Sequence, residues 1–369
     1  MKTRRRYYGK DRISGLPDCL LLHILSNLKM SQAVEISILS TRWKDLWKHM
    51  TDIFLHFRNF ESIKSFASFV SQFFSFRNDE TSLQALTFEC RNHFDPEQLK
   101  RILKYLFSHK IQRLDMTVVC SLEQFPLCTN FSYGTLTSLK LFACEEWKRW
   151  LGPPAVFPNS LKLPALTYLF LRNFTLRSTT GDGNAEPFSV FQSLNTLIIR
   201  NCQLYKDKDN LFISSLSLVN LTISFYMRYR SYYNLKLSTP NLSSFDISGS
   251  PFQNLSAHNT LSSIKHVRID LLLCPTTLPK FSSILFDWLA QLALVESLTI
   301  SSTTLQILNF IPDSFKIHFP YLHNLKLLKI ETQRELPQPD GTEDFFLQNS
   351  PSAKKVIFLR RTMKGFIYE

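Results

Sequence analysis

The sequence predicts an α/β chain: a small helical block at the N-terminus, then a solenoid whose stacked parallel strands line the concave face of a horseshoe. Two observations lead to this prediction. Apolar residues recur at helical spacing between residues 17 and 47, and beyond residue 82 a short apolar pattern returns many times at strand spacing. The chain therefore divides into a part that can dock and a part that can display a surface.

The first predicted helix begins at Pro17. Proline fits the first turn of a helix, where its missing N–H is not needed, and Asp18 suits the positive end of the helix dipole. The apolar residues that follow at helical spacing are Leu20, Leu21, Ile24, Leu25 and Leu28.

Two more short helices are predicted, the second of them capped by Ser31. About forty residues cannot bury this many large side chains against each other. Periodicity alone leaves two interpretations open, a cap on the following array or a docking site for a partner. The apolar positions of these two helices are Val34, Ile38, Leu39, Trp43, Leu46 and Trp47.

The order and spacing of the N-terminal residues decide between these interpretations. The deciding residues are Asp11-Arg12-Ile13-Ser14, Leu16-Pro17-Asp18, Leu21, Ile24-Leu25-Ser26, Ala33-Val34, Leu39-Ser40, Arg42-Trp43 and Leu46-Trp47. Over roughly residues 11–55 this run resembles the F-box of the plant F-box/leucine-rich-repeat proteins, an FBD-like family. Lys29-Met30 stands where relatives usually carry Pro-Thr, and Thr41 where Lys is usual.

The resemblance implies a role in an SCF-type ubiquitin ligase. In that family the F-box binds a Skp-type adaptor, which bridges to a cullin and a RING subunit, and the repeats bind the protein target. The chain is then a non-catalytic substrate-recognition subunit; the alternative is a non-degradative scaffold whose helical block is only a cap. The residues expected to contact the adaptor are Leu16, Pro17, Leu20, Leu21, Ile24, Leu25, Val34, Leu39, Trp43 and Leu46.

The rest of the chain carries the pattern L-x-x-L-x-L at periods of roughly 22 to 31 residues, which overlaps the range of leucine-rich repeats. The expected rungs are Leu83/Leu86/Phe88, Ile111/Leu114/Met116, Leu136/Leu139/Leu141, Leu166/Leu169/Leu171, Leu194/Leu197/Ile199, Leu218/Leu221/Ile223, Leu242/Phe245/Ile247, Ile264/Val267/Ile269, Val295/Leu298/Ile300, Leu322/Leu325/Leu327 and a degenerate Ala353/Val356/Phe358.

Each rung reads as a short strand that cannot bury its apolar face without neighbours above and below. Cys144 and Cys202 follow their rungs at the position where such repeats satisfy turn backbone. A doubly wound parallel sheet is the alternative, and we favour the solenoid because that sheet needs no fixed spacing within its strands.

The stretch from Ile63 to Phe76 joins the helical block to the first rung. Its aromatic residues fall at helical spacing, which is typical of a core-packing cap helix. The expected organisation is an F-box at 8–55, a linker with the cap helix at 56–82 and the repeat solenoid at 83–369.

Composition excludes several classes of function. The chain has 9 Gly and no phosphate-binding glycine motif, which argues against a nucleotide-binding fold. Its 7 Cys are scattered without a C-x-x-C pair, so neither a zinc site nor a disulfide framework is expected. Catalytic residues, a metal and a cofactor are all expected to be absent, since His and carboxylate residues form no catalytic motif.

We expect an intracellular protein, in the cytoplasm or nucleus, without a membrane span. A secreted repeat protein is the alternative, but polar residues interrupt the first apolar run and no cleavage site follows it. The net charge of +13 and the stretch Tyr226–Tyr233 suggest RNA binding, yet no nucleic-acid module surrounds that stretch, and a solvated loop is favoured. The basic start at Arg4-Arg5-Arg6 is weak support for nuclear import.

Alternation within the rungs indicates which side chains face the concave sheet. Most are polar: Arg113, Asp115, Asn220, Thr222, Asp246, Arg268 and Asp270. One exposed apolar cluster with a basic rim is the candidate substrate site, and a register slip of one residue would turn it inward. Its residues are Lys140, Phe142, Tyr168, Phe170, Arg172, Ile198 and Arg200.

Overall fold

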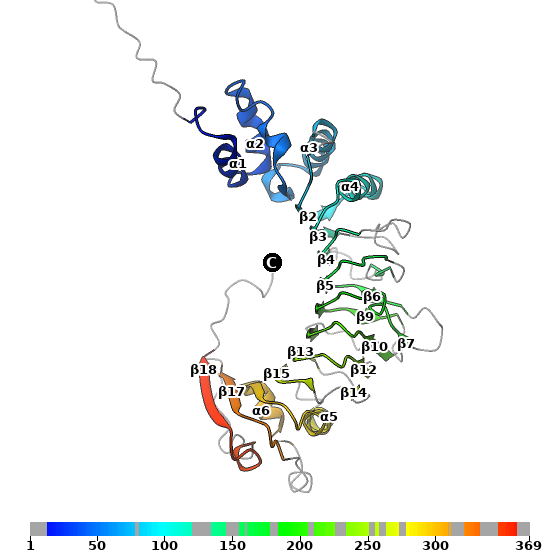
Figure 1. The fold of residues 1–369 in the computed structure, drawn as a ribbon. Coiled ribbons are helices and arrows are strands. Elements are labelled where there is room, and N and C mark those ends of the chain that lie inside the picture. Colours follow the sequence, from blue (N-terminus) through cyan, green and yellow to red (C-terminus); the bar gives the residue numbers. More distant parts are fainter. Residues whose placement is uncertain are drawn as a thin grey trace, which may run out of the picture. The chain divides into compact units, whose positions relative to one another are not determined.

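The structure is a computed structural model, and it describes residues 13–77, 81–119, 134–144, 155–158, 161–177, 184–205, 210–225, 234–250, 255–257, 263–272, 278–308, 310, 321–332 and 346–359 (Figure 1). These residues form two compact units. Unit 1 contains the described residues up to 144, and unit 2 contains those from 155 onward. The basic start of the chain and the stretch Tyr226–Tyr233 lie outside the described residues.

Unit 1 begins with the helical block. Helix α1 spans Asp18–Ser26 with Pro17 at its N-cap, so it begins one residue after the predicted start. Helix α2 spans Met30–Glu35, so its N-cap is Lys29 rather than the predicted Ser31. The backbone N–H of Lys29 donates to Gln32 Oε1 at 3.3 Å, so Gln32 completes the cap from inside the helix.

The predicted third α-helix is wrong. Residues 41–45 form turns, and only a short 3₁₀ helix, η2, follows at Leu46–His49; another, η1, extends α2 at Ile36–Ile38. The apolar face predicted for this third helix is nevertheless buried: Trp43, Leu46 and Trp47 are at most 7% exposed. So short a segment gains little from helix formation itself, and packing fixes its side chains instead.

Four parallel strands complete unit 1. They are β1 (Asp52–His56), β2 (Ala85–His93), β3 (Arg113–Val119) and β4 (Ser138–Cys144), paired in that order. Parallel neighbours need crossover segments, and helices supply two of them. The 3₁₀ turn η3 (Phe57–Asn59) and helix α3 (Ile63–Phe76) join β1 to β2, and α4 (Pro96–Ser108) joins β2 to β3.

Helix α3 has the bounds expected of the cap helix and packs through aromatic side chains. Phe66 is fully buried, and its ring centroid lies 5.5 Å from that of Phe88 and 5.9 Å from that of Phe94. Phe73 contacts the helical block, since its ring centroid lies 5.1 Å from that of Trp47. The helical block and the cap helix therefore share one core.

The main sheet of unit 2 has eight parallel strands in chain order. They are β5 (Tyr168–Arg172), β8 (Thr196–Arg200), β11 (Asn220–Phe225), β13 (Ser244–Gly249), β15 (His266–Leu271), β16 (Ser297–Ser301), β17 (Leu327–Thr332) and β18 (Lys354–Leu359). Within this unit the sheet lines the inner side of a curve (Figure 1). This arrangement is the parallel stack expected of a repeat solenoid.

The outer side of unit 2 is built from short strands and two helices. A small parallel sheet has the order β14 (Leu255–Ala257), β12 (Asn234–Ser238), β10 (Asn210–Ser214) and β7 (Asn184–Ala185), and β6 (Thr175–Leu176) pairs with β9 (Gln203–Leu204). Helices α5 (Leu278–Gln291) and α6 (Ser302–Leu308) belong to the later repeats. Where the structure describes the return segments of the middle repeats, they are therefore short strands.

The predicted inward positions of the first nine rungs are all buried, at most 2% exposed. The tenth rung was placed three residues too early. Leu328 and Ile330 align with Leu298 and Ile300, while Leu327 faces outward. The sequence contains two overlapping matches to the L-x-x-L-x-L pattern here, one starting at Leu322 and one at Leu325. Only the pairing of the strands shows that the second is the rung.

The eleventh rung is out of register by one residue. Ile357 pairs with the inward Ile330, which places Val356 and Phe358 on the opposite face beside Lys329 and Glu331. Strand β18 is the edge of the described sheet, and Val356, Ile357 and Phe358 stay 37–45% exposed. Because no described strand lies beyond β18, burial no longer distinguishes its two faces.

Cys202 occupies the turn position expected after its rung. Its thiol lies 3.7 Å from the carbonyl oxygen of Leu171 and 3.5 Å from that of Arg200, and the residue is 2% exposed. The thiol therefore hydrogen-bonds to backbone carbonyl groups in two consecutive rungs.

Candidate functional site

The residues expected to contact the adaptor fall into two groups. Four are core residues of the helical block: Leu21, Leu25, Trp43 and Leu46 are between 0 and 7% exposed. Their side chains are therefore removed from the surface expected to meet the adaptor, because they are the inner half of the same helical periodicity. The other six are exposed or half-buried: Leu16, Pro17, Leu20, Ile24, Val34 and Leu39.

Two further apolar residues of the helical block are exposed and were not among those expected to contact the adaptor. Ile38 is 85% exposed and Ile13 is 57% exposed. Ile38 was assigned to the apolar stripe of the second helix, but α2 ends at Glu35 and the chain continues as a 3₁₀ turn. The change from 3.6 to 3 residues per turn moves Ile38 off that stripe. We define the apolar docking face as Ile13, Leu16, Pro17, Leu20, Ile24, Val34, Ile38 and Leu39.

The buried residue Trp43 fixes the segment that leads into α1. Its indole Nε1 donates to Ser14 Oγ at 2.9 Å. Arg42 forms an ion pair of 2.5 Å with Asp18, and its guanidinium also donates to the carbonyl oxygen of Leu16 at 3.4 Å. These contacts hold the Leu16-Pro17 turn against the rest of the block.

The remainder of unit 1 anchors the helical block from the other side. Arg77 follows α3, is buried, and donates from its guanidinium to the carbonyl oxygen of Met50. Burial lowers the pKa of Arg77, while Tyr105 acts in the opposite direction. Thr81 and His49 are joined by a hydrogen bond of 3.2 Å. These contacts attach the helical block, which carries the docking face, to the rest of unit 1.

The candidate substrate residues lie where strand alternation predicts, on the outward positions of their strands. Lys140 and Phe142 belong to β4 in unit 1, and the other five belong to β5 and β8 in unit 2. Lys140 is exposed and the six others are half-buried: Phe142, Tyr168, Phe170, Arg172, Ile198 and Arg200. The register slip that would turn them inward does not occur.

The five residues in unit 2 lie in register on the neighbouring strands β5 and β8. Phe170 pairs with Ile198 and Arg172 with Arg200 across β5 and β8. The guanidinium carbon of Arg200 lies 5.4 Å from the centroid of the Phe170 ring, a cation–π contact that holds the arginine over the sheet.

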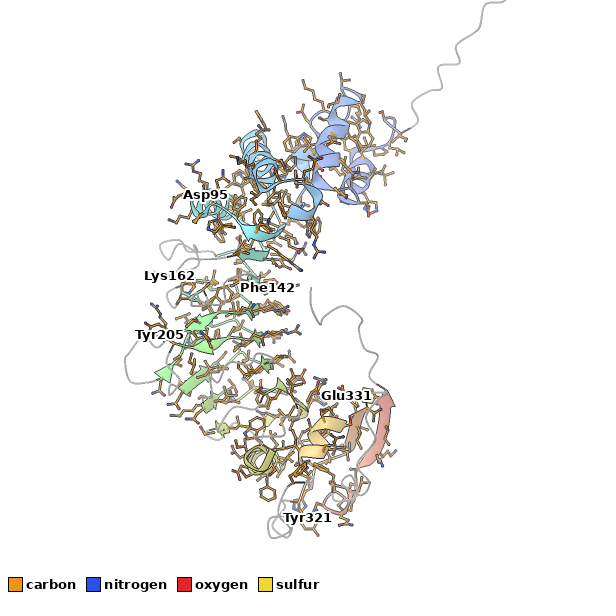
Figure 2. The ribbon with its side chains drawn as sticks, turned by 180° about the vertical axis from the view of Figure 1, so that it is seen from behind. Asp95, Phe142, Lys162, Tyr205, Tyr321 and Glu331 are labelled. Atoms are coloured by element: carbon orange, nitrogen blue, oxygen red, sulfur yellow. The ribbon has the colours of Figure 1, made fainter. Side chains whose placement is uncertain are left out.

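Further along the same inner face, Arg268 on β15 lies among acidic side chains. It forms hydrogen-bonded ion pairs with Asp270 at 3.1 Å and with Glu331 on β17 at 2.6 Å. Asp246 pairs with Arg268 in the strand register. Figure 2 shows Glu331 on the inner side of unit 2, whereas Lys162 and Tyr205 point outward on the opposite side.

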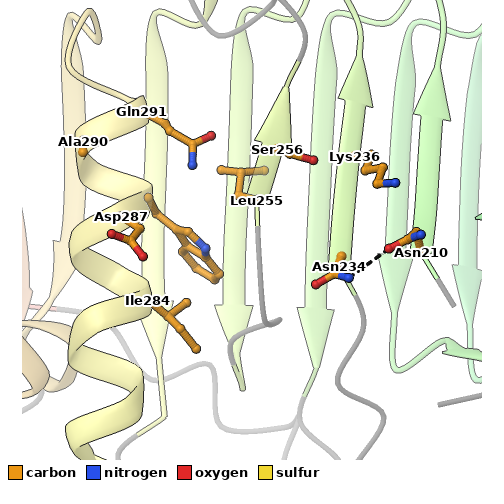
Figure 3. A pocket seen from close by; sticks show the side chains of 10 residues that line it. Asn210, Asn234, Lys236, Leu255, Ser256, Ile284, Asp287, Ala290 and Gln291 are labelled. Carbon is orange, nitrogen blue, oxygen red and sulfur yellow. Dashed lines mark hydrogen bonds between the residues drawn. The ribbon is translucent and has the colours of Figure 1, made fainter. Parts of the chain in front are cut away.

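A pocket of about 550 Å³ lies on the outer side of unit 2, between the small sheet and α5 (Figure 3). Asn210 donates to Asn184, and Asn234 donates to Asn210, each at 2.9 Å, so three amides form a ladder across the small sheet. Trp288 at the pocket wall is 1% exposed, which leaves no open aromatic face for a ligand. We interpret the amide ladder as a device that stabilises the small sheet.

Neither a metal centre nor a membrane span emerges from the parts of the chain that the structure describes. No group of three or more His, Cys, Asp or Glu side chains in those parts could hold a metal ion. No helix in them is both long enough and apolar enough to cross a bilayer.

Comparison with known proteins identifies the N-terminal region. The F-box domain family matches residues 13–54. F-box/LRR-repeat protein 13 of Arabidopsis thaliana is 32% identical over 171 residues, which cover 44% of this chain and 35% of that protein. An FBD-associated F-box protein of the same plant is 26% identical over 380 residues, covering 94% of this chain and 76% of the relative. A further Arabidopsis F-box/LRR-repeat protein is 29% identical over 272 residues, covering 71% of this chain and 44% of the relative.

Proposed function

We propose a function on the premise that this chain carries an F-box domain at its N-terminus and that its homologues are Arabidopsis F-box/LRR-repeat and FBD-associated F-box proteins. The chain is the substrate-recognition subunit of an SCF-type ubiquitin ligase. Its F-box docks on a Skp-type adaptor, and through it on the cullin and RING subunits. Its repeat array binds the protein that is to be ubiquitinated.

One observation above all supports adaptor docking, namely the exposure of the apolar docking face. Ile38 and Leu39 are 85% and 76% exposed, and Leu20 on α1 is 48% exposed. Apolar surface is stabilised by removal from water at about 25 cal/mol per Å². Neighbouring exposed apolar residues of this size are typical of a surface that a partner covers.

The competing function is a non-degradative scaffold in which the helical block is only a cap. The contact between Trp47 and Phe73 and the hydrogen bond from Arg77 to Met50 favour a capping role, because they join the block to the cap helix. A cap role leaves Ile38 and Leu39 unexplained, since both are exposed. The two roles are compatible, with the inner half of the block packing on unit 1 and the outer half meeting the adaptor.

The proposed catalytic contribution is proximity. F-box/LRR proteins are generally non-catalytic, and ubiquitin is transferred by the conjugating enzyme that the cullin and RING subunits recruit. This chain holds the target so that its lysines are close to the reactive thioester, which raises their effective concentration. The proposed target-binding residues are Lys140, Phe142, Tyr168, Phe170, Arg172, Ile198 and Arg200.

Adaptor docking is tested by co-purification of the full chain with a Skp-type adaptor. Leu20→Glu and Leu39→Glu place a charge on the docking face and should reduce adaptor recovery at least about tenfold, because burying an unpaired charge is strongly unfavourable. Leu216→Glu is the matched control, since Leu216 is 77% exposed but belongs to unit 2. Full recovery with both docking-face variants would overturn the proposal.

A second measurement separates the ligase from the scaffold. The reconstituted complex with cullin, RING subunit and conjugating enzyme should ubiquitinate a protein that co-purifies with the chain. Phe170→Ala combined with Arg200→Ala should abolish this modification and leave adaptor recovery intact. Adaptor binding without any ubiquitination of a captured protein would favour the scaffold.

A further inference from the structure

The inner face of unit 2 carries a cation without a carboxylate partner. Arg200 on β8 forms no ion pair with any residue that the structure describes, and its Nε is buried without a hydrogen-bond partner among those residues. The Phe170 ring, 5.4 Å from the guanidinium carbon, fixes the side chain in place. Because its orientation is already fixed, Arg200 loses little conformational freedom when it binds an anion.

The same face carries a carboxylate without a hydrogen-bonded partner. Asp246 on β13 is half-buried, and the described part of the chain offers it neither a hydrogen bond nor an ion pair within 4.0 Å. Its register neighbour Arg268 is committed elsewhere, to Asp270 and Glu331. On this face three carboxylates, those of Asp246, Asp270 and Glu331, lie near two cations, Arg268 and Lys329, so one negative charge is in excess.

Strand register fixes the distance between these two charges. Arg200 aligns with Ser224 on β11, while Asp246 aligns with Thr222 on the same strand. The two residues are therefore two strands apart across the sheet and two residues apart along it. With strands about 4.8 Å apart and a rise of about 3.3 Å per residue, their Cα atoms are separated by about 12 Å.

The surface between the two charges is small and mostly polar. Thr222 is half-buried there, whereas Ser224 and Ser248 are 3% and 5% exposed, and Ser248 donates to Ser224 Oγ at 2.7 Å. A bound segment therefore crosses the sheet over the small side chain of Thr222. Phe170 and Ile198 provide an apolar edge beside Arg200.

We propose that this face binds an extended peptide segment of the target in which an acidic and a basic side chain are four residues apart. The acidic side chain pairs with Arg200 and the basic side chain pairs with Asp246. Residues i and i+4 of an extended chain point to the same side and are roughly 13 Å apart, which matches the spacing of the two charges. The proposal rests on the proposed function, because it describes how the repeat array holds its target.

Charge complementarity favours a peptide over a nucleic acid as the occupant. A phosphate backbone would pair with Arg200 and Arg172, but it would meet Asp246, Asp270 and Glu331 a few strands away. A peptide with both signs of charge satisfies both ends, and charges arranged this way contribute more to specificity than to affinity.

The test is selection of random twelve-residue peptides displayed on phage against the full chain. Enriched sequences should contain Asp or Glu four residues from Lys or Arg, in either order. A synthetic enriched peptide should bind at least about tenfold more weakly to Arg200→Glu and to Asp246→Lys than to the wild type. Exchanging the acidic and basic residues of that peptide should restore binding to the double variant Arg200→Glu/Asp246→Lys.

Matched variants keep the test decisive. Lys236→Glu and Asp287→Lys reverse charges on the outer side of unit 2 and should leave affinity unchanged. Arg200→Gln and Asp246→Asn remove the charges with little change of volume, and each should still weaken binding if a reversed variant fails to fold.

Three results would overturn the proposal. They are enriched peptides without the charge pair, affinities unchanged in all four inner-face variants, and tight binding of single-stranded poly(U) RNA that Asp246→Asn strengthens. Adaptor recovery, measured on the same variants, distinguishes this failure from that of the proposed function. If only the peptide site is wrong, adaptor recovery still depends on Leu20 and Leu39.

Discussion

Arg268 on β15 donates two hydrogen bonds to Glu331 on β17, from Nε to Oε1 at 3.1 Å and from Nη2 to Oε2 at 2.6 Å. The guanidinium therefore reaches past β16, the strand between them. A third hydrogen bond of 3.1 Å goes to Asp270 on its own strand. These bonds join β15 to β17 across β16 and leave Asp246, the register neighbour of Arg268, without a hydrogen-bonded partner in the described part of the chain.

Removing the charge of Glu331 should destabilise unit 2. The Glu331 side chain is 11% exposed and that of Arg268 is 25% exposed. Glu331→Gln should lower the free energy of unfolding by about 1–3 kcal/mol, as expected for the loss of charged hydrogen bonds. Urea denaturation followed by circular dichroism measures the change.

The matched control is Glu296→Gln. Glu296 pairs with Lys326 at 2.7 Å, but the Lys326 side chain is 73% exposed. Solvent screens this pair, so the substitution should leave the free energy of unfolding nearly unchanged. Equal effects of the two substitutions would contradict the buried-pair argument.

Asp246 should make the folded chain less stable as pH rises. Burial raises the pKa of Asp246 above its usual value; the attraction of Arg268 opposes the shift and the charge of Glu331 adds to it. The folded chain then keeps the Asp246 proton at a pH where the unfolded chain has lost it, so ionisation weakens the folded state between those two pKa values.

Asp246→Asn removes this ionisation. At pH 7 the variant should be at least as stable as the wild type, and the difference should vanish at about pH 3, below the ordinary pKa of aspartate. Parallel urea titrations across this range measure it. A variant that is less stable at pH 7 would show that the carboxylate is stabilising as an anion.

Gly249 at the end of β13 should tolerate no side chain. Its φ is +89°, and a Cβ at this position would lie 1.8 Å from the carbonyl oxygen of Phe225. Gly249→Ala should cost about 2–4 kcal/mol, since backbone strain and a clash combine. Gly134→Ala is the control, because a Cβ there meets no atom within 4 Å. A thermal melt that shows equal loss for both would refute the argument.

The aromatic core of unit 1 should depend on Phe66. Its ring is fully buried between α3 and β2, whereas Phe76 at the end of the same helix is 65% exposed. Phe66→Ala should lower the free energy of unfolding by about 3–5 kcal/mol. Phe76→Ala, the same change on the same helix, should lower the free energy of unfolding by less than about 1 kcal/mol. Denaturation of both variants by guanidinium chloride measures the difference.

Cysteine reactivity should separate Cys19 from Cys202. Burial raises the pKa of Cys202 to about 12, against the weaker opposite effect of nearby backbone hydrogen bonds. Cys19 is exposed. At pH 8 a disulfide reagent should modify Cys19 within minutes and Cys202 only after unfolding, because the thiolate is the reactive form. Mass spectrometry of the labelled peptides identifies the sites, and early labelling of Cys202 would contradict its burial.

Regular spacing made the repeat strands predictable. Nine rungs could be placed from three apolar residues each, because a strand that buries one face must alternate. At the tenth rung, Leu322/Leu325/Leu327 and Leu325/Leu328/Ile330 fit the pattern equally, and only pairing with β16 decides. At β18 the signal weakens, because no described strand lies beyond it and apolar residues occupy both faces.

The exposure of the residues in the proposed docking face was only partly predictable. Helical periodicity identified the apolar residues of α1 but could not divide Leu20 and Ile24, which are exposed, from Leu21 and Leu25, which are buried. That division depends on what packs against the helix. Ile38 was missed because the change from α to 3₁₀ geometry follows from packing and leaves no mark in the apolar pattern.

The sequence by itself determined the first two helices of the N-terminal block, the cap helix from Ile63 to Phe76, and the alternation that turns Phe170 and Arg200 outward. These features depend on local periodicity and on a motif of fixed order. Only the tertiary structure decided which docking residues are buried, where the last two rungs lie, and that Arg268 pairs with Glu331 63 residues away and not with Asp246. Such choices arise between strands that pairing brings together, and no periodicity within one strand records them.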